Sequence, residues 1–184
     1  MKVTTVIGVA LALVGAYAAG DRLATARAGL TAQQSAIHDA WLQVDAVLAR
    51  RAALLPRLAE ALHHDPLATP ALADLSSAAS ELRAARSTRG RIAASARLED
   101  AVSRLLPLLS HRPGLLPNPA AASLRDDLLH TENEIAVQRR KYNDAVQKYN
   151  MSIELFPNNI AASLFGFSRD DAYLETKPAK RDTP

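Results

Sequence analysis

Residues 131–157 read TENEIAVQRRKYNDAVQKYNMSIELFP, and this stretch decides the fold. Lys-Tyr-Asn at 141–143 recurs at 148–150, one heptad later. Large apolar residues recur here, and in the turns just upstream, mostly four or seven positions apart: Leu124, Leu128, Ile135, Tyr142, Tyr149 and Phe156, with Val146 and Ile153 on the same face. Such spacing keeps apolar side chains on one side of an α-helix, as in a coiled-coil seam. We predict one long helix over 120–156, ended by Pro157.

Three further helices are predicted upstream of this segment. The first runs from about Leu23 to about His63, with a kink at Pro56. Its stripe consists of Ile37, Trp41, Val44, Leu48, Leu55, Leu58 and Leu62. The second runs from Pro70 to about Thr88 and is ended by Gly90. Its stripe consists of Leu72, Leu75, Ala79 and Leu82.

The third predicted helix begins near Ile92, bends at Pro107 and ends before Pro113. Its stripe consists of Ile92, Leu98, Val102, Leu105, Leu106 and Leu109. A short helix follows at 160–167. Each long helix carries one apolar stripe, which a single shared core satisfies. We therefore predict an all-α fold, an antiparallel bundle of about four helices in which the first and last are long. The predicted domains are an anchor at 1–22, a bundle at 23–176 and a disordered tail at 177–184.

The N-terminal segment Val3–Ala19 contains no charged residue. Its 17 residues would span about 25 Å as a helix, at the short end of what crosses a bilayer. The alternative is a cleaved signal peptide, with Lys2 before the apolar run and an A-x-A-like site at 16–18. Because the helical pattern continues past Leu23 without a proline or a loop residue, we favour a transmembrane anchor. We expect a single-pass protein of a bacterial inner membrane.

The last helix resembles the LemA family over Thr131–Asn150, and the likeness continues through Phe156-Pro157 and Phe165-Gly166-Phe167. The first helix is similar to that family too, in AWLQVD at 40–45 and RRAALLP at 50–56. The two middle helices depart from the pattern. The resemblance implies an N-terminal membrane helix followed by a soluble helical bundle, and it supplies no catalytic motif.

Composition excludes several classes of function. The chain has no cysteine, which excludes disulfide scaffolds and thiolate metal sites. The net charge of +3 is spread along the chain without a basic block interleaved with aromatics, which argues against nucleic-acid binding. No nucleophilic triad or glycine-rich phosphate loop is present. We therefore expect no cofactor and no enzymatic activity.

The candidate site is a partner-binding face on the last helix, made of Arg139, Arg140, Asn143, Lys148 and Asn150. Core packing is the favoured role for the two seam tyrosines and for Trp41, the single tryptophan. Glu132 and Arg139 lie a heptad apart and are expected to find ionic partners on other helices.

The leading functional hypothesis is a membrane-anchored scaffold that binds an unidentified membrane or membrane-proximal protein. A self-associating structural bundle is the first alternative. A di-metal carboxylate enzyme is the second, because such sites combine Glu-x-x-His pairs with further glutamates. Its candidate ligands are Glu60, His63, Asp127, His130, Glu81 and Glu99.

Overall fold

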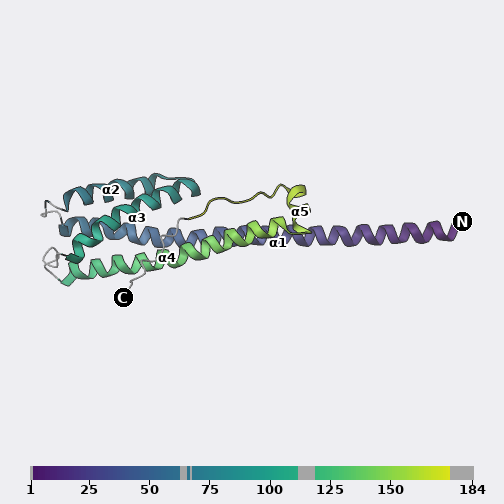
Figure 1. Ribbon diagram of the computed structural model, residues 1–184, viewed down its shortest axis with the longest axis horizontal. Helices are drawn as coiled ribbons and strands as arrows, with labels where there is room; N and C mark the ends of the chain where they lie inside the picture. The colour runs from purple at the N-terminus through teal and green to yellow at the C-terminus, as the bar shows by residue number, and fades with distance from the viewer. Residues whose placement is uncertain (1, 63–65, 67, 112–118, 175–184) are drawn as a thin grey trace, which may run out of the picture. The chain divides into compact units, whose positions relative to one another are not determined.

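The computed structural model describes residues 2–62, 66, 68–111 and 119–174, and across them the chain is all-α, without a strand (Figure 1). The predicted all-α fold is therefore confirmed. The helices are α1 (Lys2–Leu62), α2 (Thr69–Ala84), α3 (Thr88–His111), α4 (Pro119–Glu154) and α5 (Asn158–Phe165). Helix α1 continues without a break from the apolar N-terminal segment and through Pro56. The predicted tail at 177–184 lies outside the described residues.

Two compact units divide the chain. Unit 1 comprises residues 1–40 and 143–173, and unit 2 comprises residues 41–142 and 174–184. Helices α1 and α4 each contribute one part to each unit. The domain boundaries expected at residues 22 and 176 stay a prediction.

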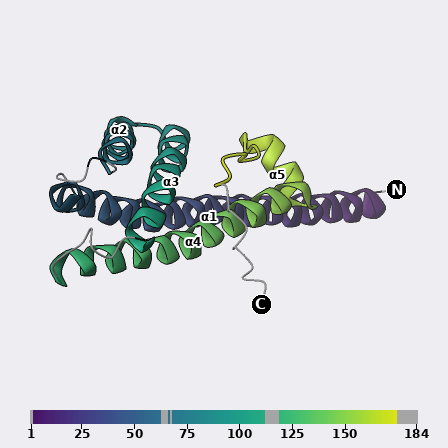
Figure 2. The same cartoon turned by 60° about the vertical axis from the view of Figure 1, so that its left-hand side comes forward.

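Unit 2 is an antiparallel arrangement of helices. Helices α2 and α3 lie side by side in Figures 1 and 2 and are joined by residues 85–87, so they run in opposite directions. On α1 and α4, Trp41 contacts Tyr142 while Arg51 pairs with Glu132. From Trp41 to Arg51 the residue numbers increase along α1, while those of their partners on α4 decrease from Tyr142 to Glu132. These two helices are therefore also antiparallel.

The core of unit 2 is built from the predicted stripes. The Trp41 ring is 6% exposed and meets Tyr142 edge to face, with ring centroids 5.8 Å apart. The other buried stripe residues are Val44, Leu48, Leu55, Leu58, Leu62, Leu75, Ala79, Leu82, Leu98, Val102, Leu105, Leu109, Leu124, Leu128 and Ile135. The prediction that Trp41 is a core residue is confirmed.

Gly90 does not end the second helix, which corrects the prediction. Helix α2 ends at Ala84, where the following Ala85 takes an extended conformation. Helix α3 then begins at Thr88, and the Gly90 N–H donates to the Ser87 hydroxyl at 3.1 Å. A serine hydroxyl that accepts from an amide three residues on is the usual start of a helix. A Cβ at Gly90 would lie 3.0 Å from that hydroxyl, so glycine leaves room for the contact.

The core of unit 1 is smaller and contains short side chains. Its buried residues come from α1, α4 and α5: Ala26, Leu30, Ile37, Val146, Tyr149, Ile153, Ala161 and Ala162. Helix α5 ends at Gly166, whose φ of 76° suits glycine, and the Phe167 N–H donates to the Ala162 carbonyl at 2.9 Å.

Phe156 lies outside the seam to which the sequence pattern assigned it, and this is a second correction. Helix α4 ends at Glu154, so the heptad spacing no longer applies two residues later. The Phe156 side chain is 75% exposed.

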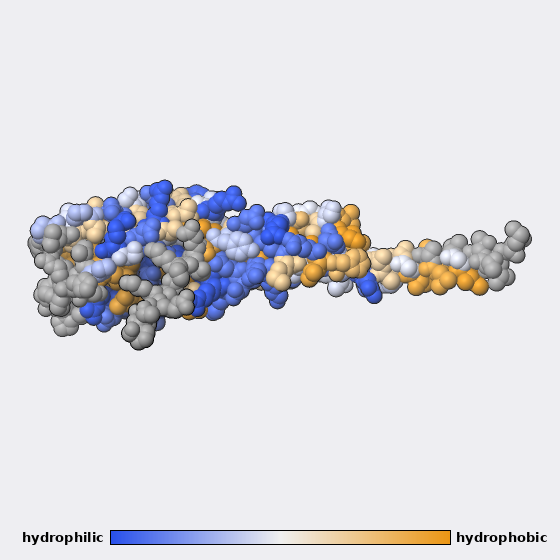
Figure 3. Space-filling model, in the orientation of Figure 1, coloured by the Kyte–Doolittle hydropathy of each residue, from blue (hydrophilic) through white to orange (hydrophobic). Residues whose placement is uncertain are grey.

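The N-terminal part of α1 is apolar and faces outward (Figure 3). Its exposed large side chains are Val6, Ile7, Leu11, Leu13, Val14 and Tyr17. By length and composition, α1 is the one helix among the described residues that could cross a membrane.

Candidate functional site

Unit 2 contains a fully buried guanidinium group, that of Arg51 on α1. Its Nη2 donates to the Glu132 carboxylate of α4, and its Nε lies 3.5 Å from the Thr131 hydroxyl. Burial lowers the pKa of Arg51, while the charge of Glu132 and its hydrogen bond oppose that shift. The guanidinium keeps its charge, because an arginine pKa begins far above neutrality.

A second ion pair joins α4 to α3 in the same unit, and here both partners are buried, whereas the Glu132 side chain is 36% exposed. Arg139 Nη1 donates to the Glu99 carboxylate, and the two residues are 5% and 9% exposed. The charges of both residues also act on Arg51. We call Arg51, Glu99, Glu132 and Arg139 the buried ion-pair cluster. The prediction that Glu132 and Arg139 find partners on other helices is confirmed.

Further ion pairs lie at the surface of unit 2. Arg91 pairs with Asp45 and also donates to the Leu82 carbonyl at 3.3 Å. Other pairs between helices are Arg97–Glu81 at 2.7 Å, Arg104–Asp74 at 3.2 Å and Arg50–Glu134 at 3.1 Å. Solvent-exposed pairs of this kind contribute at most about 1 kcal/mol each. Removing one partner of a buried pair should cost more than that, because it leaves an uncompensated charge away from water.

Two of the four carboxylates proposed as metal ligands serve in these ion pairs. Glu99 binds Arg139, and Glu81 binds Arg97. Within the described residues, no group of three or more His, Asp or Glu side chains could hold a metal ion. His63 lies outside the described residues, and His130 is exposed.

The residues of the predicted partner face fall into two groups. Arg140 and Lys148 are exposed, and Asn143 is half-buried. Arg139 and Asn150 are buried, because each has partners on another element of its own unit. Neither side chain is therefore presented at the surface of this chain. The face itself stays a prediction, carried by its exposed members.

Asn150 has a structural role in unit 1 that sequence reasoning missed. Its Nδ2 donates to the Asp170 carbonyl at 2.7 Å and to the Tyr173 hydroxyl at 3.1 Å. Its Oδ1 accepts from the Asp170 N–H at 2.9 Å. Asn150 thereby holds the segment that follows α5 against α4. The sequence feature that could have indicated this role is the position of Asn150 beside the apolar seam, where a polar side chain without a hydrogen-bond partner is costly.

The neighbouring Tyr149 hydroxyl joins three elements of unit 1. It donates to the Ser168 carbonyl at 2.9 Å and accepts from Gln34 Nε2 on α1 at 3.2 Å. Burial raises the pKa of Tyr149, because a phenolate would lose its hydration. The prediction that Tyr142 and Tyr149 pack in the core is confirmed, since each is 1% exposed.

The end of α4, the following turn and α5 expose an apolar surface in unit 1. It consists of Met151, Leu155, Phe156, Ile160, Leu164 and Phe165, which we call the apolar cap. The Arg27 guanidinium of α1 lies over the Phe165 ring, 4.8 Å from its centroid.

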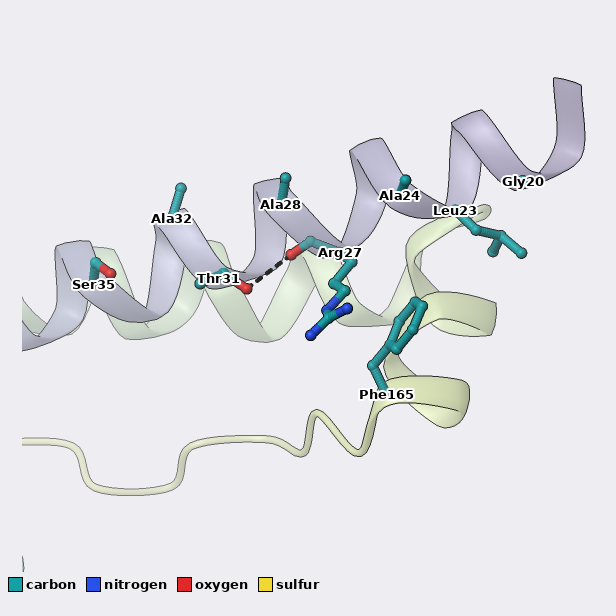
Figure 4. Close-up of a pocket in the computed structure, with 9 residues that line it drawn as sticks. All are labelled: Gly20, Leu23, Ala24, Arg27, Ala28, Thr31, Ala32, Ser35 and Phe165. Atoms are coloured by element: carbon teal, nitrogen blue, oxygen red, sulfur yellow. Dashed lines mark hydrogen bonds between the residues drawn. The ribbon is translucent and has the colours of Figure 1, made fainter. Parts of the chain in front are cut away.

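An open groove of about 690 Å³ adjoins the apolar cap along α1 (Figure 4). Its floor consists mainly of small residues and its wall includes Phe165: the lining is Gly20, Leu23, Ala24, Arg27, Ala28, Thr31, Ala32, Ser35 and Phe165. The Thr31 hydroxyl donates back to the Arg27 carbonyl at 3.0 Å.

Comparison with known proteins supports the family suggested by the residues. Residues 40–184 match the LemA family. Magnetosome proteins MamQ 1 and MamQ 2 of Paramagnetospirillum magneticum are each 33% identical to this chain over 85 residues. The aligned stretch covers 46% of this chain but only 30% of either relative. Since the family match extends over most of its 184 residues, the chain belongs to the LemA family.

Proposed function

We propose that this protein is a membrane-anchored, non-catalytic LemA-type scaffold whose helical bundle binds another protein close to the bilayer. The observation that carries the proposal is the outward-facing apolar surface of α1. Leu11, Leu13 and Val14 are each about two-thirds exposed, in a segment that contains no charge. Exposed apolar area costs about 25 cal/mol per Å² in water, and a bilayer removes that cost.

The charged residues support a binding role rather than a chemical one. In unit 2 the buried Glu99 carboxylate and the partly exposed Glu132 carboxylate accept hydrogen bonds from arginines of neighbouring helices. Arg140 and Lys148 remain exposed on α4, and neither has an ion pair among the described residues. An anchor would confine these basic side chains to the membrane surface, where the effective concentration of a partner held there is high.

The anchor is tested by placing a charge in it. We expect Leu11→Arg to move the protein out of the alkali-resistant membrane fraction, because an arginine at the centre of a spanning helix costs about 3 kcal/mol. Leu42→Arg is the matched control, since Leu42 is also exposed and on α1 but lies in unit 2. Equal extraction of wild type and both variants would argue against an anchor.

The partner is tested by photo-crosslinking in intact membranes. A crosslinker placed at Arg140 or at Lys148 should capture one reproducible protein, and one placed at the exposed Arg86 should not. Crosslinks only between copies of this chain would support the self-associating alternative instead. Capture that is the same at all three positions would contradict a specific face.

A further inference from the structure

The apolar cap is unusual for a surface that faces water. Residues 155–167 read LFPNNIAASLFGF and contain no charged side chain. Phe156 is 75% exposed, Leu164 65% and Leu155 61%. Contiguous exposed apolar groups of this kind mark an interaction surface, because soluble proteins rarely leave them uncovered.

The opposite face of α5 explains why these side chains point outward. Ala161 is fully buried and Ala162 is 6% exposed, so α5 packs on unit 1 through small residues. Its larger residues Ile160 and Leu164 are left on the outer face. Helix α5 therefore packs on unit 1 with its alanines, and its bulky apolar side chains point away from the unit.

The position of the cap along α1 points to what covers it. Phe165 lines the same groove as Gly20, Leu23 and Ala24, which lie just after the uncharged segment 3–19 and on either side of the charged pair Asp21-Arg22. In Figure 3 the apolar surface of this region lies toward the apolar N-terminal part of α1, with a paler stretch and a hydrophilic group between them. The cap thus lies close along α1 to the segment that the proposed function assigns to the bilayer.

We propose that the apolar cap inserts into the headgroup and acyl boundary of the membrane that holds α1, so that this chain contacts lipid at two places. The inference rests on the proposed anchor. Apolar helix faces are buried at this boundary in interfacial helices, and aromatic residues such as Phe156 and Phe165 favour it. The Arg27 guanidinium above Phe165 is placed where a lipid phosphate would accept its remaining hydrogen bonds.

A lipid surface fits the cap better than a protein partner does. Protein interfaces surround an apolar centre with charged and polar groups. Within the run from Leu155 to Phe167 no residue is charged, and the flanking Glu154 and Arg169 pair with each other. The run also adjoins the part of α1 that follows the proposed membrane-spanning segment.

The absence of cysteine makes the test direct, because one introduced cysteine can be labelled at a chosen depth. Full-length protein carrying Leu164→Cys, labelled with an environment-sensitive fluorophore, is reconstituted in phosphatidylcholine and phosphatidylglycerol vesicles. Quenchers are placed on lipid chains near the headgroup or near the bilayer centre. Leu13→Cys reports the anchor, and Val137→Cys is the control for an exposed apolar residue of unit 2.

We expect the Leu164 label to be quenched by the shallow lipid, the Leu13 label by the deep lipid, and the Val137 label by neither. Adding Ile160→Glu to the Leu164 variant should reduce its quenching to the Val137 level while the Leu13 signal is unchanged. Quenching at Leu13 without quenching at Leu164 would overturn the inference and leave the anchor intact. Loss of deep quenching at Leu13 would instead overturn the proposed anchor.

Two labels at Leu164 in neighbouring copies would quench each other if the cap bound a second chain. Self-quenching that depends on protein density, without quenching by lipid, would therefore also overturn the inference. Circular dichroism of each variant checks that the helices are retained, which is expected because the substituted side chains are exposed.

Discussion

Unit 2 buries charged side chains, with Arg51 and Arg139 held against Glu132 and Glu99 between helices. Unit 1 instead buries neutral polar groups, such as the Asn150 amide, and exposes large apolar residues on α1 and in the apolar cap. A buried charge ties a helix to one partner, because leaving it unpaired is costly, whereas exposed apolar groups are favourably covered by something outside the chain. Under the proposed function, the covering surface for unit 1 is the membrane.

The largest effect is expected from breaking the buried ion-pair cluster. Arg139→Met leaves the Glu99 carboxylate buried without its guanidinium, which should lower the free energy of unfolding by about 3–5 kcal/mol. The measurement is urea unfolding of the full chain in detergent, monitored by circular dichroism.

Two further variants make that prediction specific. Removing both charges with Glu99→Leu and Arg139→Met should recover most of the loss, because no uncompensated charge remains. Arg97→Met, which breaks the exposed pair with Glu81, should cost less than about 1 kcal/mol. If Arg139→Met lowered the free energy of unfolding no more than Arg97→Met does, burial would not make the Arg139–Glu99 pair more costly to break.

A smaller effect, confined to unit 1, is expected from Asn150→Ala. The substitution removes three hydrogen bonds to Asp170 and Tyr173. Leaving buried groups unpaired costs about 1–3 kcal/mol. Hydrogen exchange should speed up at residues 168–173, and the exposed Gln147→Ala is the control. An equal loss of protection around Glu99 would contradict the separation of the two units.

The smallest effect is expected from Tyr149→Phe, which removes the hydrogen bonds to Gln34 and Ser168 and should cost about 1 kcal/mol near neutral pH. Because the pKa of Tyr149 is raised in the folded chain, its contribution is complete below the unfolded pKa of about 10. This contribution to stability is lost as pH rises through the pKa that Tyr149 has in the folded chain.

The pH dependence is measured as the difference in unfolding free energy between wild type and Tyr149→Phe. The difference should be constant from about pH 7 to pH 9 and should shrink above about pH 10. A difference that stays constant at alkaline pH would contradict the burial of this hydroxyl.

The apolar periodicity was sufficient to predict most of the fold. Stripes at three- and four-residue spacing identified the long helices, the buried Trp41 and the seam tyrosines, because residues at those spacings share one face of a helix. The same rule misplaced Phe156, since it assumes that the helix continues, and α4 ends at Glu154. A different rule, that glycine breaks a helix, misplaced the end of the second helix, because the Gly90 contact with Ser87 begins helix α3 instead.

The candidate site was less accessible to sequence reasoning. The sequence predicted that Glu132 and Arg139 would pair across helices, but it could not name Glu99 as the partner of Arg139. It also placed Asn150 on a partner face, whereas the segment after α5 covers that side chain.

The sequence alone determined the helices, the apolar N-terminal segment and the LemA resemblance, because periodicity, composition and local motifs involve neighbours along the chain. Only the tertiary structure decided which charges are buried, what Asn150 binds and that α5 turns its bulky residues outward. These features depend on contacts between residues far apart in sequence. Whether a polar group lies in water or against a partner is settled only when the helices pack.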